Sequence, residues 1–172
     1  AASMAGHMKL GRLIVLFDDN NISIDGSTDL STSDDTSSRF EAYGWQVLSC
    51  DGHDMDAVSA AISSAQADDR PSLICCKTVI GLGSPNKQGT SGVHGAPLGD
   101  AEIALARETL GWPHPAFEIP ADILAEWRAV GARGAAAHQS WQDRHATSQN
   151  KTAFDAAIAN DFDKAVANAV LA

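Results

Sequence analysis

An unbroken apolar run over residues 13–17 stops abruptly at four polar residues, Asp18-Asp19-Asn20-Asn21. The run contains β-branched, aliphatic and aromatic side chains, which is typical of a strand buried on both faces of a sheet. In parallel α/β sheets, ligands bind just beyond the carboxyl ends of the strands. The polar cluster is therefore predicted to lie where a metal-bound, phosphate-bearing ligand binds.

Two more strands follow, with the strand–helix–strand order and spacing of a parallel sheet. Residues 45–50 and 72–80 are predicted to form these strands, and residues 54–67 between them a helix. The helix is indicated by apolar side chains at helical spacing, namely Met55, Val58, Ala61, Ile62 and Ala65. The predicted fold class is α/β, a parallel sheet flanked by helices on both faces.

Capping and breaking residues delimit the other segments. The polar segments 18–38 and 81–99 are expected to be long loops, which in compact domains are usually functional. Helices are expected over residues 1–10 with Gly11 as the stop, over 35–43, over 100–110, and from Pro120 in one long helix that carries Trp127 and Trp141.

The net charge of −10 argues against partners that are nucleic acids or anionic membranes. Cys50, Cys75 and Cys76 lie in apolar runs, and an odd count with an adjacent pair suits buried thiols in a reducing cytoplasm. No apolar run reaches transmembrane length and no signal peptide opens the chain, so a cytoplasmic protein is expected. The first residues, which lack an initiator Met, read as the second half of a helix and suggest a fragment of a longer chain.

The first candidate site is the turn around Asn20. Hard cations such as Mg²⁺ prefer oxygen ligands, and the Asn20 side chain and the backbone carbonyl of Ile22 can face one ion if the loop turns sharply. An EF-hand is rejected, because Ile22 and Ser23 stand where that loop needs an oxygen ligand and a glycine. The alternative is that these residues only cap the strand and form Asx turns.

Two further candidates lie in the glycine-rich segment 81–99. His94 stands beside Gly95, and a histidine there could donate to a phosphate oxygen or move a proton, although a loop histidine is more often only solvated. The stretch 81–89 could wrap a phosphate through backbone N–H groups, but it lacks the P-loop pairing, and a flexible lid or crossing loop is at least as good an interpretation. Among the other aromatic and histidine residues, His7 is expected to pack in the first helix, and Trp127 and Trp141 to anchor a core or an interface.

Five segments between residue 1 and about residue 145 resemble the transketolase family and occur in the same order as in that family. The two most specific in combination are Asp-Asp-Asn followed by Ile-Asp-Gly, and His-Gly-Ala-Pro-Leu. The segments are Gly6–Gly11, Phe17–Gly26, Arg39–Trp45, Ile80–Lys87 and His94–Gly99.

The resemblance implies a thiamine diphosphate-binding fold, present in part. It assigns Asn20 as a side-chain ligand and Ile22 as a backbone ligand of the Mg²⁺ or Ca²⁺ that holds the cofactor's diphosphate. It places His94 beside the cofactor and the donor substrate as a catalytic and cofactor-binding residue, and Ile80 in the cofactor pocket. The family's Gly-Asp-Gly metal motif lies farther upstream than the 19 residues that precede Asn20 here.

The implied activity is that of a thiamine diphosphate-dependent enzyme of the pentose phosphate pathway or Calvin cycle. It moves a two-carbon ketol unit from a ketose phosphate to an aldose phosphate, and the intact enzyme is expected to be a cytoplasmic homodimer with sugar-phosphate substrates. Residues 1–145 would form an N-terminally incomplete diphosphate domain, and residues 146–172 a helical linker or terminal arm. The alternatives are a sister enzyme (dihydroxyacetone synthase or deoxyxylulose-phosphate synthase), a non-catalytic or split-subunit cofactor-binding module, and a purely structural interaction domain.

Overall fold

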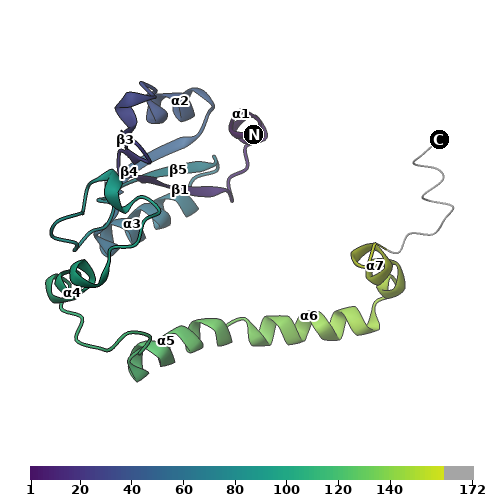
Figure 1. Ribbon diagram of the computed structural model, residues 1–172. Helices are drawn as coiled ribbons and strands as arrows, with labels where there is room; N and C mark the ends of the chain where they lie inside the picture. The colour runs from purple at the N-terminus through teal and green to yellow at the C-terminus, as the bar shows by residue number, and fades with distance from the viewer. Residues whose placement is uncertain (161–172) are drawn as a thin grey trace. The chain divides into compact units, whose positions relative to one another are not determined.

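The computed structural model describes residues 1–160 and divides the chain into two compact units, Ala1–Pro113 and a second unit from His114 onward (Figure 1). Within residues 1–160, no helix has the length and apolar content needed to cross a membrane.

A three-stranded parallel sheet forms the centre of the first unit. Its order is β1 (Ile14–Asp19), β5 (Ser72–Lys77) and β4 (Gln46–Asp51), and both neighbours of β5 start level with Ser72. The helix α3 (Met55–Gln66) connects β4 to β5. The predicted βαβ unit and the parallel α/β fold are therefore confirmed.

Helices cover both faces of this sheet (Figure 1). Successive side chains of β5 pack alternately in the cores on the two faces. On one face Leu73 and Cys75 pack in a core that Trp45 and Ala5 complete. On the other face Ile74 and Cys76 pack in a core with Ala65 of α3. Because a strand alternates its side chains with a period of two, the short apolar run of β5 contributes to both cores.

Two helices, α1 (Ala2–His7) and α2 (Thr36–Ala42), cover the Trp45 face. The indole Nε1 of Trp45 donates a hydrogen bond to the carbonyl of Ala2 at 2.9 Å, which ties α1 to the start of β4. The predicted stop of α1 at Gly11 is wrong. Lys9 takes the left-handed conformation (φ 50°), and the N–H of Leu10 bonds back to Ala5 at 3.1 Å, so the helix ends earlier in a Schellman-type turn.

Several sequence-based expectations for the first unit need correction. Leu16 is 50% exposed, because β1 is an edge strand of the sheet within residues 1–160, and it is not buried on both faces as predicted. Met55 is exposed at the first residue of α3, which lies beyond the stripe that faces the sheet. His7 is exposed and does not pack. The third strand ends at Lys77 and does not reach Ile80.

The segment 18–38 was expected to be a loop but contains regular structure. The strands β2 (Ile22–Ser23) and β3 (Gly26–Ser27) form a small antiparallel hairpin, and a short 3₁₀ turn follows over Thr28–Leu30. The segment 81–99 is mainly irregular, with one 3₁₀ turn at Ser91–Val93 before α4 (Asp100–Thr109).

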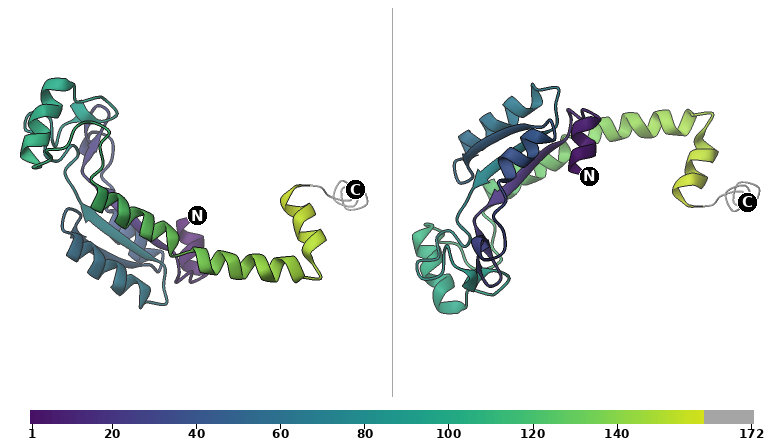
Figure 2. Two further views of the ribbon diagram at one scale, coloured as in Figure 1. Left: turned by 90° about the horizontal axis from the view of Figure 1, so that it is seen from below. Right: turned by 90° about the horizontal axis from the view of Figure 1, so that it is seen from above.

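Within residues 114–160, the second unit contains the helices α5 (Ala121–Ala132), α6 (Ala135–Thr147) and α7 (Lys151–Ile158) (Figure 2). The single long helix predicted from Pro120 is wrong, because the helix is interrupted at Arg133 and Gly134. Trp127 is 72% exposed within the chain and anchors no core there, whereas Trp141 stacks on His145 with ring centroids 4.9 Å apart. The predicted division at residue 145 stays a prediction, and residues 161–172 of the predicted arm lie outside the described residues.

Candidate functional site

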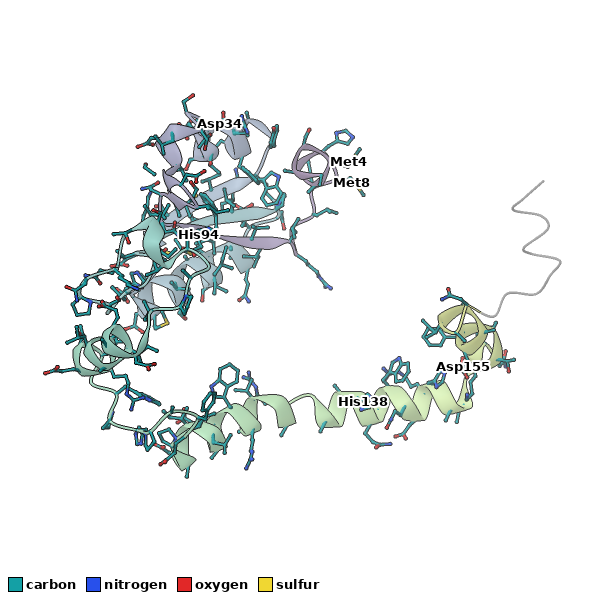
Figure 3. All side chains as sticks on the ribbon, viewed as in Figure 1. Met4, Met8, Asp34, His94, His138 and Asp155 are labelled. Carbon is teal, nitrogen blue, oxygen red and sulfur yellow. The ribbon has the colours of Figure 1, made fainter. Side chains whose placement is uncertain are left out.

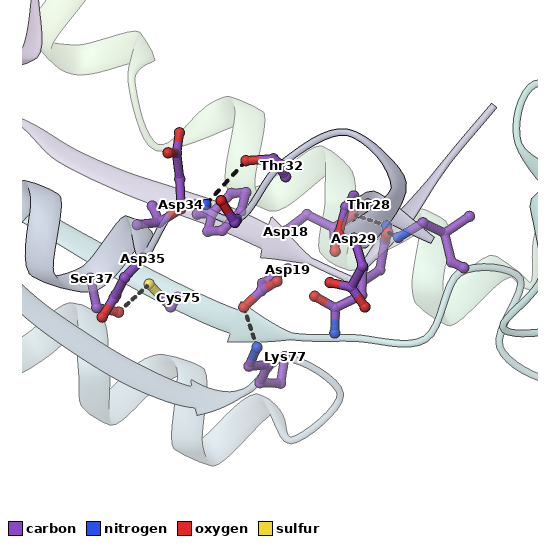
Figure 4. Close-up of a pocket in the computed structure, with 16 residues that line it drawn as sticks. Asp18, Asp19, Thr28, Asp29, Thr32, Asp34, Asp35, Ser37, Cys75 and Lys77 are labelled. Carbon is purple, nitrogen blue, oxygen red and sulfur yellow. Dashed lines mark hydrogen bonds and ion pairs between the residues drawn. The ribbon is translucent and has the colours of Figure 1, made fainter. Parts of the chain in front are cut away.

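A cleft of about 600 Å³ lies at the carboxyl end of β1 (Figure 4). The end of β1 and the following turn form one wall, and residues 28–37 and the end of β5 form the others. Asn20 and Ile22, which were predicted to act together, both line it. Its position agrees with the general rule for ligand sites in parallel sheets.

The turn from Asn20 to Ile22 is an Asx turn. The side-chain Oδ1 of Asn20 accepts a hydrogen bond from the N–H of Ile22 at 2.9 Å. Asn21, between them, has a φ of 58°, a left-handed conformation that asparagine tolerates better than most side chains. An amide oxygen accepts two bonds, so Asn20 Oδ1 can keep this hydrogen bond and still coordinate a cation.

Contacts with β5 fix the two carboxylates before this turn. The side chain of Thr78, the residue after β5, donates to Asp18. The ammonium group of Lys77 pairs with Asp19, whose side chain is 18% exposed (Figure 4). These two contacts join the end of β1 to the end of β5. Asn20 therefore follows a segment of backbone that is held on the sheet.

Carboxylates dominate the charge of the cleft. Lys77 is the one basic side chain among its lining residues, against the five carboxylates of Asp18, Asp19, Asp29, Asp34 and Asp35. Three of the five have partners outside the lining residues. Asp18 accepts from the side chain of Thr78, Asp34 pairs with Arg39 at 2.9 Å, and Asp35 caps α2 by accepting from the N–H of Ser38 at 3.0 Å. A bare diphosphate would be repelled here, so an anionic ligand needs a divalent cation between itself and the wall. The oxygen donors fit such a cation.

The chain does not provide a complete metal cage in the part that the structure describes. Within residues 1–160, no group of three or more His, Cys, Asp or Glu side chains is placed to hold an ion. A cation at the Asn20 oxygen and the Ile22 carbonyl would therefore need further ligands.

His94 and Ile80 lie elsewhere. His94 is exposed at the end of the Ser91–Val93 turn and does not line the cleft (Figure 3). Ile80 is half-buried, and its carbonyl accepts from the N–H of Gly89 at 2.8 Å. The structure brings Asn20 and Ile22 together but does not add these two residues to their cleft, so their cofactor roles stay predictions.

The comparison with known proteins decides the family. Residues 1–167 match the family model described as "Transketolase, thiamine diphosphate binding domain". The chain belongs to the transketolase family. A transketolase of Cereibacter sphaeroides is 56% identical over 161 residues, which cover 94% of this chain and 24% of that protein. Transketolase 1 of Vibrio parahaemolyticus is 61% identical over 142 residues, or 82% of this chain and 21% of that protein.

Solved transketolase structures share the fold. The enzyme from Campylobacter jejuni superposes with a TM-score of 0.80 at 35% identity, over 90% of this chain and 25% of that one. The enzyme from Leishmania mexicana gives 0.79 at 35% identity, over 90% and 24%. The chain thus spans about a quarter of the length of the relatives it matches.

One buried carboxylate of this transketolase-family chain was missed by the sequence analysis. Glu102 of α4 is 7% exposed and accepts from Ser84 Oγ at 2.5 Å and from both the N–H and the side-chain amide of Asn86 at 2.9 Å. Lys87, next in sequence, donates to the carbonyl of Leu98 at 2.8 Å. The bonds to Glu102 attach the start of the segment that carries His94 to α4, and the Lys87 bond joins that start to Leu98 at the end of the segment. These bonds favour a crossing loop over a flexible lid or a phosphate-wrapping stretch.

Replacing Glu102 with glutamine is expected to loosen residues 81–99, because the new NH₂ group faces a donor and one hydrogen bond is lost. Amide hydrogen exchange in residues 81–99 of the full-length protein should therefore be faster in Glu102→Gln than in wild type. Glu108→Gln, an exposed change on the same helix, is the control and should leave exchange unaltered. Equal exchange in wild type and Glu102→Gln would contradict the role of Glu102.

The effect of Glu102→Gln on hydrogen exchange is expected to depend on pH. The hydrogen bond from Ser84, followed by those from Asn86, lowers the pKa of Glu102 below its ordinary value of 4.5. A carboxylate whose pKa is lower in the folded state stabilises the fold above the unfolded-state pKa, and that stabilisation disappears as the pH falls through the folded-state value. The difference in exchange between wild type and Glu102→Gln should therefore be full above pH 4.5 and vanish in stronger acid.

Proposed function

We propose that this chain forms part of a thiamine diphosphate-dependent transketolase. The whole enzyme would transfer a two-carbon ketol unit from a ketose phosphate to an aldose phosphate. The observation that carries the proposal is the Asn20–Ile22 turn, held at the carboxyl end of β1 in a cleft of about 600 Å³. The family match of residues 1–167 supports it.

In this proposal, Asn20 and Ile22 hold the divalent cation, Mg²⁺ or Ca²⁺, through the side-chain oxygen and the backbone carbonyl. The other ligands come from outside residues 1–160. The cation offsets the carboxylates of the cleft, so that the cofactor's diphosphate can approach the end of β1. Thiamine diphosphate supplies the carbon–carbon bond chemistry, and the protein supplies orientation and electrostatics.

His94 is proposed to donate hydrogen bonds to the hydroxyl groups of the ketose donor and to move a proton during transfer. Its exposure in the described chain leaves the ring free to meet a substrate, while the bonds of Glu102 and Lys87 fix the segment that carries it. Ile80 is proposed to line the cofactor pocket. Both assignments rest on the family motifs around these residues.

The wider setting belongs to the same proposal. Sugar phosphates are the substrates, the intact enzyme is a homodimer, and it works in the cytoplasm in the pentose phosphate pathway or Calvin cycle. Structures of the Pichia stipitis transketolase, which is 38% identical with a TM-score of 0.77, are complexes with fructose 6-phosphate and sedoheptulose 7-phosphate. Those complexes support sugar phosphates as the substrate class.

Assay of the purified full-length protein tests the activity. Fructose 6-phosphate and an aldose phosphate acceptor should give a new ketose phosphate only when thiamine diphosphate and Mg²⁺ are both present. In a parallel assay with formaldehyde as the acceptor, preferential formation of dihydroxyacetone would favour the sister enzyme, and no turnover under any of these conditions would contradict the proposal.

The left-handed residue of the turn gives a second test. Asn21→Val places a β-branched residue at a φ of 58°, which costs about 1–2 kcal/mol. If the turn must hold this shape to bind the cation, the apparent Mg²⁺ affinity of the full-length protein falls by roughly 5–30-fold. Asn21→Gly, which adopts this conformation without strain, should keep the wild-type affinity. Equal Mg²⁺ affinity in wild type and both variants would show that metal binding does not depend on the shape of this turn.

A further inference from the structure

Two cysteines face each other across neighbouring strands. Cys50 of β4 and Cys76 of β5 are partners in the parallel register, and their Sγ atoms lie 3.9 Å apart on the face of the sheet that α3 covers. Both are free thiols. Neighbouring strands are about 4.8 Å apart, which lies within the range of Cα separations that a disulfide spans.

The two thiols differ in access. Cys50 is half-buried and lines a second cleft, of about 450 Å³, at the carboxyl ends of β4 and β5. Cys76 is 7% exposed, and burial, followed by the hydrogen bond with Cys50, raises its pKa to about 11. A small oxidant therefore meets Cys50 first, and Cys76 is held within reach of whatever forms there.

We propose that Cys50 and Cys76 form a reversible disulfide when the protein meets a hydroperoxide. The Cys50 thiolate attacks one peroxide oxygen, the O–O bond breaks, and the departing oxygen takes a proton to leave as water or an alcohol. The sulfur of Cys76 then attacks the Cys50 sulfenic acid, the S–O bond breaks, and the Cys76 proton leaves with hydroxide as water. The two sulfurs lose two electrons in all, and the peroxide gains them.

The position of this pair links it to the rest of the sheet. Cys76 is also the register partner of Asp18 in β1, so the disulfide would lie in the same row as the first carboxylate of the Asn20 cleft. The proposal does not depend on the activity proposed above, because it concerns only the thiols and an oxidant.

Cys75 provides a matched control. It is adjacent to Cys76, but its side chain points to the opposite face, where its Sγ lies 3.8 Å from Ser37 Oγ in the first cleft (Figure 4). Loss of Cys75 should therefore leave the reaction between Cys50 and Cys76 unchanged.

The test treats the folded full-length protein with a small excess of hydrogen peroxide and alkylates the remaining thiols. Cleavage before aspartate then separates residues 35–50 from residues 69–99. Mass spectrometry should find these peptides joined and lighter by two hydrogens, with the link removed by dithiothreitol. Because the fold holds the thiols together, linkage should be at least roughly tenfold faster than in urea.

The variants decide which thiol takes part. Cys76→Ser should abolish the link, and Cys75→Ser should keep it at the wild-type rate. A link that survives Cys76→Ser and disappears in Cys75→Ser would overturn the proposal. So would wild-type protein in which Cys50 is oxidised to sulfinic acid and no linked peptide forms, a result that needs no variant to fold.

Discussion

Asn20→Ala in the full-length protein is expected to weaken the apparent affinity for Mg²⁺ at least tenfold, the order of loss seen even for residues behind metal ligands. Alanine removes the side-chain oxygen that faces the cleft and also the hydrogen bond to the N–H of Ile22. The affinity for thiamine diphosphate should fall with it, because the diphosphate is held through the metal. Measuring cofactor-dependent activity at increasing Mg²⁺ concentrations gives both values.

Ile22→Val is the matched control for this change. It alters the side chain but keeps the backbone carbonyl that is proposed as the second ligand, so the Mg²⁺ affinity should stay near that of wild type. If Asn20→Ala binds the metal and the cofactor as wild type does, Asn20 is not a ligand and its Asx turn is only structural.

His94→Ala is expected to lower kcat/KM for the ketose donor by roughly a hundredfold or more, the usual contribution of a positioned proton donor or acceptor. The alanine variant should keep its Mg²⁺ affinity, because His94 does not line the Asn20 cleft. Steady-state kinetics with donor and acceptor varied separately measure the effect, which should be larger for the donor.

His7→Ala, a change at an exposed histidine of α1, is the control and should leave the kinetics unaltered. Wild-type turnover in His94→Ala would remove His94 from the reaction. A loss of the same size in both variants would show that the assay reports stability and not chemistry.

The arrangement of the sheet could be predicted from the sequence because its signals are local. The apolar runs before Asp18 and around Cys75, with a helix between the second and third strands, are enough to specify a parallel βαβ unit. The pairing of Asn20 with Ile22 in one turn could also be predicted, because both residues belong to the same few residues of chain.

The contacts that sequence reasoning missed are made over longer distances or depend on neighbours. Glu102 contacts Ser84, 18 residues earlier, and no periodicity connects the two. Leu16 is an apolar residue of the kind usually found in a core. Its exposure depends on how far neighbouring elements cover the edge strand β1, which the sequence of β1 does not specify. The break of the predicted long helix near Gly134 was missed because a single glycine costs a helix only about 1 kcal/mol and often does not end it.

The most direct test of the central claim is a calorimetric titration of thiamine diphosphate into the full-length protein, with Mg²⁺ and again after its removal by a chelator. We expect saturable binding with Mg²⁺ and loss of that binding in the chelated sample, because the carboxylate-lined cleft repels a bare diphosphate. Equal binding in both samples would contradict a metal-bridged diphosphate at the Asn20–Ile22 turn.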